Sequence, residues 1–250
     1  ATIKRDLPIP GFDAVGIVQA MDFLKNQNEI IDNKKTMIPD LNANNKNVIV
    51  IGGGDTGSDC IGTSNRQGAK SVVNFEILPK PPKERSLENP WPYWPFTLKS
   101  SSSHEEGSNR NWSILTKEFI KNDSGKLTGL KTVKVEWEKS INERPKLIEI
   151  EGSEKVWPCD LVLLALGFTG PEKNILQKLK LKMDSSNKPK TNEYKTNDSK
   201  VFAAGDLRRG QSLIVWAISE GREAAYKIDE YLMGSSNLPT KTKGDLPLVK

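Results

Sequence analysis

The sequence has few of the residues on which metal, disulfide and acid–base sites depend. Its 250 residues include two cysteines, Cys60 and Cys159, which stand far apart without a C-x-x-C pair, and a single histidine, His104. This spacing argues against a disulfide framework, a zinc site and a redox dithiol within the chain. A catalytic histidine needs a polar partner, and none is identifiable near His104, so we expect a structural or surface role for it. We assign no catalytic residue and no metal ligand.

Long apolar runs and clustered charge are also lacking. The longest apolar stretch, Leu161 to Leu166, is strand-like and far too short to span a membrane. The net charge of +5 is modest and the lysines are scattered, so we expect neither a membrane nor a nucleic-acid partner. No signal peptide is visible and Ala1 stands first in place of Met. We therefore expect a fragment or a processed product, with a cytoplasmic location and an organelle as the alternative.

The most informative stretch is a short apolar run followed at once by three glycines. The run Val48 to Ile51 consists of four β-branched residues, which is typical of a strand buried on both faces. Within the segment that follows, three glycines match the G-x-G-x-x-G spacing; the segment reads Gly52, Gly53, Gly54, Asp55, Thr56, Gly57. In this pattern the first glycine makes the tight turn, the second lets the backbone approach a pyrophosphate, and the third lets the next helix pack on the strand.

The residues after the glycines fit the same interpretation. A helix is predicted from about Thr56 to Gln67, with Gly68 after its end and its N-terminus directed at phosphates. A second strand, 71–77, places Glu76 nineteen residues after Gly57, where an acid can hydrogen-bond the adenosine ribose. The alternative is a Rossmann-like βαβ unit that has lost its ligand.

The rest of the chain predicts an α/β protein with an antiparallel meander. We expect a helix over 14–25 capped by Asp13, a polar linker over 26–46 and meander strands between 115 and 150. Buried strands are expected over 160–168 and 201–206. The last predicted helix, 213–233, has one face that we expect to be buried: Ile214, Ala217, Ile218, Gly221, Ala224, Ala225, Ile228 and Leu232.

Prolines punctuate the segment 79–96, with Trp91, Tyr93 and Trp94 among them. Such prolines exclude a regular helix or central strand. Two interpretations stay open: a docking loop that presents aromatic anchors to a partner, or a loop packed on itself.

Several runs together closely resemble the C-terminal part of the flavin-dependent, NAD(P)H-oxidising subunit or region of glutamate synthase. The matching runs extend over nearly the whole chain: Arg5 to Gly11, Gly52 to Gly62, Glu76 to Pro82, Asn89 to Pro92, Leu115 to Phe119 and Ala203 to Leu213. Runs of this length are more specific than the glycine pattern alone.

The resemblance implies two Rossmann-type domains, an FAD domain interrupted by an NAD(P)H domain, with the FAD domain incomplete here. On this basis 1–13 is the exit strand of the FAD domain, 14–165 the NAD(P)H domain, 166–238 the C-terminal part of the FAD domain and 239–250 a tail. The resemblance implies flavin-binding roles at the crossover, at a strand end and at a helix start: Gly167, Gly205, Asp206, Gln211, Ser212, Leu213 and Ala217.

The resemblance also implies an activity. Hydride passes from the nicotinamide to FAD, and electrons move through iron–sulfur clusters to FMN, where 2-iminoglutarate is reduced to glutamate. The iron–sulfur clusters and FMN belong to the rest of the enzyme. The implied partners are the N-terminal FAD and iron–sulfur region, which precedes the stretch with which this chain begins, and the glutamate-forming glutamine amidotransferase region or subunit.

Glu76 predicts a preference for NADH over NADPH. Two like charges about 4 Å apart repel by about 4 kcal/mol at an effective dielectric near 20, which disfavours a 2′-phosphate. Lys80, Lys83 and Arg85 follow closely and offer a counter-argument, because they can turn toward a phosphate. Two rival functions also remain: a related flavin reductase with another acceptor, and an inactive nucleotide-binding fragment.

Overall fold

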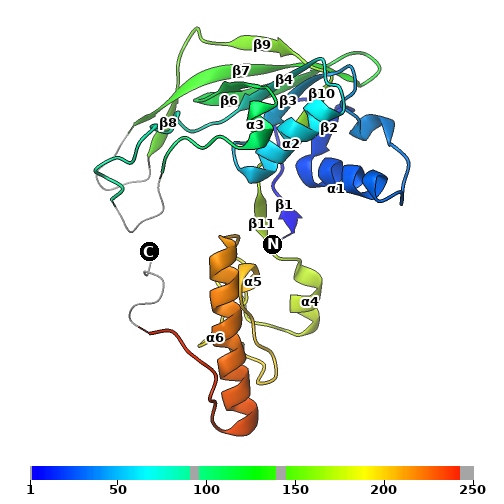
Figure 1. The fold of residues 1–250 in the computed structure, drawn as a ribbon. Helices are drawn as coiled ribbons and strands as arrows, with labels where there is room; N and C mark the ends of the chain where they lie inside the picture. The colour runs from blue at the N-terminus through cyan, green and yellow to red at the C-terminus, as the bar shows by residue number, and fades with distance from the viewer. Residues whose placement is uncertain (1, 91–95, 139–144, 243–250) are drawn as a thin grey trace. The chain divides into compact units, whose positions relative to one another are not determined.

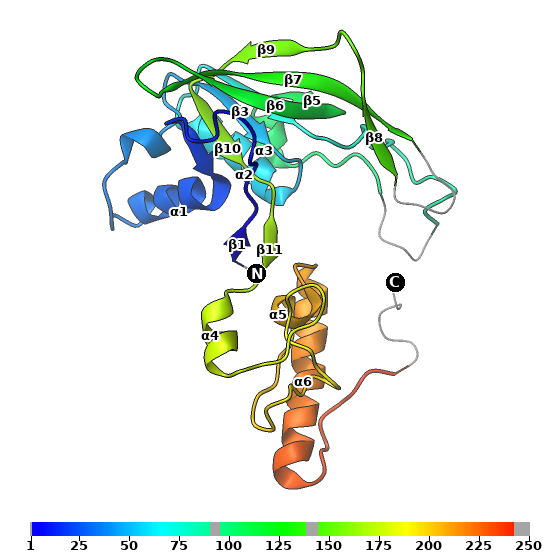
Figure 2. The same cartoon turned by 180° about the vertical axis from the view of Figure 1, so that it is seen from behind.

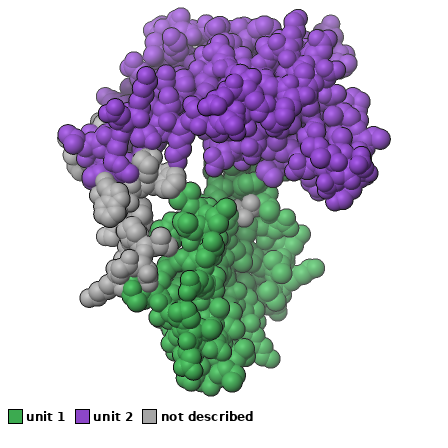
Figure 3. Space-filling view, viewed as in Figure 1, with its two compact units in different colours: residues 1–5, 167–250 green, residues 6–166 purple. Residues whose placement is uncertain are grey.

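The computed structural model describes residues 2–90, 96–138 and 145–242, and the chain in it divides into two compact units. Unit 2 is Asp6–Leu166, and unit 1 combines Ala1–Arg5 with Gly167–Lys250 (Figure 3). The chain therefore leaves unit 1 after five residues and returns to it at Gly167. The domain roles expected from the sequence remain proposals.

Unit 2 is built on a parallel five-stranded sheet in the order β2-β10-β3-β4-β5 (Figure 1). Its strands are β2 (Ile17–Gln19), β3 (Asn47–Ile51), β4 (Ser71–Phe75), β5 (Asn109–Asn111) and β10 (Leu161–Leu164). The apolar run predicted as a buried strand is the central strand β3, and residues 48–51 of it are buried. Because β3 has a neighbour on each side and layers on both faces, every side chain of this run is removed from water.

Two different layers cover the sheet (Figures 1 and 2). Helices α1 (Ala20–Ile31) and α2 (Asp55–Arg66) pack on Val48, Val50 and Leu163. The meander strands pack on the alternate residues of the same strands, among them Ile49 and Val162. Successive side chains of a strand point to opposite faces, so the two hydrophobic cores lie on opposite sides of the sheet. Two short helical turns, η1 (Pro39–Leu41) and α3 (Ser102–Glu105), complete unit 2.

The antiparallel meander predicted between 115 and 150 is present. It comprises β6 (Ile114–Lys121), β7 (Leu127–Glu138), β8 (Lys146–Glu149) and β9 (Lys155–Pro158). The long strand β7 pairs with β6, β8 and β9, and Trp137 lies opposite Leu147.

The helix predicted over 14–25 is wrong at its start. Residues 17–19 form β2, which pairs in parallel with β10, and α1 begins only at Ala20 and continues to Ile31. The ladder with β10 satisfies the backbone groups that a helix would have used. Asp13 does not cap this helix; its carboxylate accepts a hydrogen bond from Lys121 at 2.5 Å.

Unit 1 contains a two-stranded ribbon and three helices. Strand β1 (Ile3–Lys4) pairs antiparallel with β11 (Phe168–Gly170), and the helices are α4 (Lys173–Lys178), α5 (Asp206–Arg209) and α6 (Ile214–Met233). The strand expected over 160–168 is therefore two strands, because β10 ends at Leu164 and Gly167 adopts a left-handed φ of 76°.

The strand predicted over 201–206 does not form. Phe202 makes one isolated bridge, to Lys195, and Ala203 is the buried residue of this stretch. A strand needs a continuous ladder on at least one edge, and within the residues that the structure describes no neighbouring strand supplies one.

The burial predicted for α6 is also wrong. Of the eight residues predicted to be buried only Ala224 is, and Ile214 (76%), Ile218 (57%) and Leu232 (70%) are exposed. The other two buried residues of the helix are Ser219 and Glu220. The helix itself is as expected, and Gly234 ends it in the left-handed conformation.

The proline-rich segment forms no helix or strand over its described residues 79–90. The aromatic residues Trp91, Tyr93 and Trp94 lie outside the described residues. In the part of the chain that the structure covers, no helix has both the length and the apolar character needed to cross a membrane. The same residues contain no group of three or more His, Cys, Asp or Glu side chains that could hold a metal ion.

Both cysteines are buried, one on each side of the sheet. Cys60 packs in the α1–α2 core and Cys159 in the meander core. Removal from water, with a smaller effect of Asp59, raises the pKa of the Cys60 thiol to about 12. Removal from water and the neighbouring Asp160 raise the pKa of the Cys159 thiol to about 12 as well. The separation rules out a disulfide between them, in agreement with the sequence.

We predict that neither thiol of the native chain reacts readily with Ellman's reagent at pH 8, because the thiolate is the reactive form. Both should react within minutes in 8 M urea, which serves as the control. Labelling of either cysteine in the native chain at the rate of free cysteine would contradict this assignment.

Candidate nucleotide-binding site

The turn between β3 and α2 brings backbone atoms so close together that side chains are excluded. Gly52 has a φ of 121°, and a Cβ added to it would lie closer than 3.0 Å to the carbonyl oxygen of Ala165. A Cβ on Gly57 would lie equally close to the carbonyl oxygen of Gly52. The first and last glycines of the pattern therefore have the steric roles that the spacing predicts.

The middle glycine is different, because nothing lies within 4 Å of a Cβ placed on Gly54. Gly54 is also the N-cap of α2, so no side chain satisfies the first N–H groups of the helix. These free donors and the positive end of the helix dipole face open space beside Gly54. This combination of space, donors and positive potential is suited to an anion such as a pyrophosphate.

Asn74 of β4 fixes the shape of this turn. Its side chain is fully buried, and its Nδ2 donates to the carbonyl oxygens of Val50 at 3.1 Å and Gly52 at 2.8 Å. No role for this residue was predicted from the sequence. The available signal was an asparagine in the middle of an apolar strand, where a polar side chain needs buried partners.

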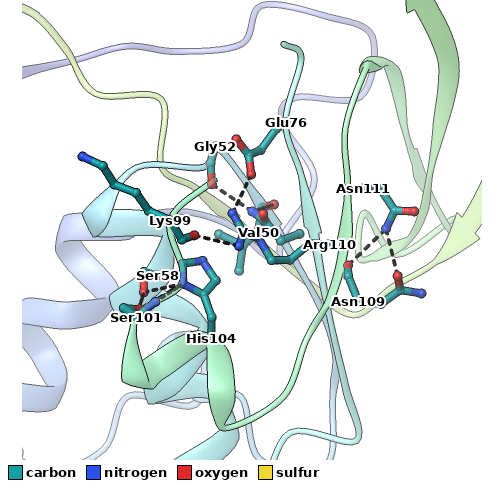
Figure 4. Close-up of polar contacts among 11 residues, drawn as sticks. Val50, Gly52, Ser58, Glu76, Lys99, Ser101, His104, Asn109, Arg110 and Asn111 are labelled. Atoms are coloured by element: carbon teal, nitrogen blue, oxygen red, sulfur yellow. Dashed lines mark hydrogen bonds and ion pairs between the residues drawn. The ribbon is translucent and has the colours of Figure 1, made fainter. Parts of the chain in front are cut away.

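Glu76 lies directly after β4, and its carboxylate reaches the glycine turn. A Cβ added to Gly53 would lie closer than 3.0 Å to the Glu76 carboxyl group. An Arg110 guanidinium nitrogen pairs with this carboxylate at 3.1 Å (Figure 4). The structure thus places Glu76 beside the loop, as the spacing predicts. The pairing of Glu76 with Arg110 was not predicted from the sequence. Arg110 comes from β5, which pairs with β4.

His104 has the polar partners that the sequence did not reveal. Its Nδ1 accepts from the backbone N–H of Ser101 at 3.1 Å, and this pair forms the capping box of α3. The Ser101 and Ser58 hydroxyls lie 3.0 and 3.3 Å from the same nitrogen, and they also contact each other (Figure 4). Burial, and next the charge of Arg110, lower the pKa of His104. These contacts fasten α3 to α2, which is a structural role.

An apolar pocket of about 200 Å³ adjoins the turn within unit 2. Gly52, Gly53 and Glu76 line its polar side, and Phe75, Ile114 and Leu166 are among its apolar walls.

In unit 1 the predicted residues divide into two groups. Asp206 and Gln211 line a cavity of about 250 Å³ together with Phe168 and Lys188. The Gln211 side chain accepts a hydrogen bond from the backbone N–H of Phe168 at 3.3 Å, which brings it next to Gly167. The second group lies at the exposed start of α6, outside the lining of this cavity, and consists of Ser212, Leu213 and Ala217.

Glu220, a buried residue of α6, fixes the turn at Gly205. One of its carboxylate oxygens accepts the backbone N–H of Gly205 at 2.9 Å, and the other pairs with Arg208 at 2.7 Å and Arg209 at 3.7 Å. Gly205 has a left-handed φ of 63° that leads into α5 at Asp206. The sequence analysis assigned no role to Glu220.

The parallel α/β fold of this chain is similar to that of pyridine-nucleotide oxidoreductases. The sequence profile of the family described as "Pyridine nucleotide-disulphide oxidoreductase" matches residues 111–221. FprA from Mycobacterium tuberculosis, solved in complex with NADPH, superimposes with a TM-score of 0.65 at 14% identity over 94% of this chain and 62% of its own. Thioredoxin reductase from T. acidophilum gives 0.54 at 19% identity over 92% and 62%. At these identities the similarity shows the fold alone.

Sequence similarity is more specific. The glutamate synthase [NADH] of Schizosaccharomyces pombe is 46% identical over 100% of this chain and 12% of its own length. The glutamate synthase [NADPH] small chain of Mycobacterium tuberculosis is 44% identical over 97% of this chain and 50% of its own, and that of Bacillus subtilis 43% over 94% and 50%. The chain is a homologue of the glutamate synthase small chain and of a region of the NADH-dependent enzyme. It spans half or less of the length of these relatives.

His104 makes a testable contribution to the pH dependence of stability. Because its pKa is lowered in the folded chain, the unfolded chain binds more protons just below pH 6.5, and stability falls as the pH falls through that range. We predict that His104→Gln makes the urea midpoint less sensitive to pH between 7 and 5. As His104 is the only histidine, the difference between the two curves isolates it. Parallel curves for the variant and the unmodified chain would contradict the prediction.

Proposed function

We propose that this chain is the NADH-binding part, together with a C-terminal piece of the FAD-binding part, of a glutamate synthase reductase. The single observation that carries the proposal is the open, uncapped start of α2 at Gly54, beside the carboxylate of Glu76. Its homology to glutamate synthases supports the particular reaction. In the proposed reaction NADH is oxidised and the electrons serve the synthesis of glutamate from glutamine and 2-oxoglutarate.

In unit 2 each part of the turn has one task toward the dinucleotide. The N–H groups at the start of α2 bind the pyrophosphate, and Gly54 leaves room for it. The Glu76 carboxylate accepts hydrogen bonds from the adenosine ribose, which favours NADH because a 2′-phosphate would meet a negative charge. Asn74 holds the carbonyl groups of the turn, so the site is formed before the ligand arrives.

In unit 1 the residues present fit one portion of an FAD site. Asp206, at the turn that Glu220 fixes, and Gln211 line the same cavity, where they would contact the ribityl chain and the pyrimidine end of the flavin. FAD, when bound, supplies hydride acceptance and one-electron transfer, which no side chain provides. This chain binds and orients the two cofactors; the iron–sulfur clusters, FMN and glutamine amidotransferase chemistry belong to the rest of the enzyme.

The packing of unit 1 supports a partner from the same enzyme. The buried hydrophobic residues among its described positions are Leu176, Leu181, Ala203 and Ala224, a small core for a unit of this size. Large apolar residues of α6, among them Ile214, Ile218 and Leu232, are exposed. Within the described residues no strand pairs along residues 201–206. We propose that the FAD region found in the longer relatives covers α6 and supplies that strand. Residues 1–13 and 166–238 would then complete the second Rossmann-type domain, with 14–165 as the first.

Two other functions are weaker. A flavin reductase with another electron acceptor would have the same two-unit fold, but the homology to glutamate synthases favours the present proposal. An inactive nucleotide-binding fragment would also have the open turn at Gly54 and would explain the small core of unit 1, but the homology to glutamate synthases favours the present proposal.

We predict that Gly54→Ala lowers the affinity for NADH by at least tenfold without unfolding the chain. The added methyl group meets no protein atom within 4 Å but fills the space proposed for the pyrophosphate. Binding is measured by the quenching of tryptophan fluorescence, and folding by the urea midpoint.

Gly221→Ala is the matched control, since its Cβ also enters open space, in α6. This control should bind NADH like the unmodified chain. Gly57→Ala should lose both binding and stability, because its Cβ collides with the Gly52 carbonyl. Unchanged NADH affinity in Gly54→Ala would overturn the proposed site.

A further inference from the structure

Arg110 and Glu76 form an ion pair that is largely shielded from water at the edge of the glycine turn. The exposed fractions of their side chains are 13% and 16%, and the nitrogen–oxygen distance is 3.1 Å. The pair joins the end of β4 to β5 next to Gly53 (Figure 4). At this place in the fold, the residue after the second strand of the βαβ unit meets the adenosine ribose.

The Arg110 guanidinium is fixed in place. Its Nη1 donates to the carbonyl oxygen of Lys99 at 3.0 Å, and its Cζ lies 4.9 Å from the centre of the Trp112 ring. Its Nε is buried and has no hydrogen-bond partner among the described residues. A guanidinium held in this way stays beside Glu76 when its partner changes, because its other contacts do not involve the carboxylate.

We infer that Arg110 is the group that would bind the 2′-phosphate of NADPH, and that its pairing with Glu76 holds the site in favour of NADH. This inference rests on the proposed function of the turn. Glu76 neutralises the guanidinium and repels a 2′-phosphate. Without the carboxylate, the same guanidinium becomes an unpaired cation with a planar fork suited to phosphate. In this inference Arg110 can bind a 2′-phosphate, and the Glu76 carboxylate prevents that binding.

The cations suggested by the sequence are less suited to this role. Lys80 is placed over the Trp112 ring, with its Nζ 4.8 Å from the ring centre. Arg85 donates to the carbonyl oxygen of Asn89 at 3.0 Å. Arg110, in contrast, pairs with the Glu76 carboxylate at 3.1 Å.

The experiment compares two probes that differ by one phosphate, 5′-ADP and 2′,5′-ADP, by isothermal titration calorimetry. The unmodified chain should prefer 5′-ADP. Glu76→Gln should bind 2′,5′-ADP at least tenfold more tightly than the unmodified chain, with a smaller change for 5′-ADP. Glu76→Gln combined with Arg110→Gln should lose this gain, and Glu76→Gln combined with Arg110→Lys should keep part of it because the charge remains.

Glu76→Gln combined with Lys80→Gln is the matched control and should keep the whole gain. If Arg110→Gln alone does not fold, the double variant, which also removes the unpaired carboxylate, still carries the test. A gain that persists without Arg110, or no gain in Glu76→Gln, overturns the inference while the proposed function stands. Failure of the unmodified chain to bind either probe overturns the proposed function and the inference with it.

Discussion

The close approach of three backbone segments at the β3–α2 turn is the constraint on which the rest of unit 2 depends. A Cβ on Gly52 would collide with the carbonyl oxygen of Ala165, and a Cβ on Gly57 would collide with the carbonyl oxygen of Gly52. This contact seats α2 against the sheet and directs its free N–H groups to the edge where the strands end. The buried Nδ2 of Asn74 donates hydrogen bonds to two carbonyl groups of the same turn. The position of the Glu76–Arg110 pair follows, since β4 and β5 continue the sheet outward from β3.

The two units differ in how far they can form a core from this chain alone. In unit 2 both faces of the sheet are covered, and large side chains such as Phe23, Phe75 and Phe119 are fully buried or nearly so. In unit 1 the central feature is the polar network of Glu220 with Arg208, Arg209 and Gly205, while apolar residues of α6 such as Ile214 and Leu232 are exposed. A helix face that stays in water contributes none of the hydrophobic stabilisation that burial brings, about 25 cal/mol for each Å² of apolar surface. The proposed partner region would recover it.

The sequence predicted what local chemistry determines. Strand β3, the glycine turn, helix α2 and the meander follow from apolar patterns and from glycines at fixed spacing, and the structure contains them. The prediction failed where a distant segment determines the local structure. Residues 17–19 pair with β10 instead of joining a helix, and residues 201–206 have no neighbouring strand among the described residues. Arg110 and Asn74 were missed because their importance lies in partners 34 and 22–24 residues away, which spacing alone does not reveal. Periodicity predicted a buried apolar face of α6, and this was wrong for this chain because no described residue covers that face.

The most direct test of the account is a visible absorption spectrum of the purified 250-residue chain, mixed with FAD, gel-filtered and then titrated with NADH under nitrogen. We predict saturable NADH binding by unit 2, no FAD retained after filtration and no bleaching of a flavin band, because unit 1 is proposed to hold only a portion of the flavin site. The same spectrum recorded with a longer relative that contains the FAD region should show a bound flavin that NADH bleaches. A chain that retains FAD by itself would contradict the division of the flavin site, and a chain that does not bind NADH would contradict the central claim.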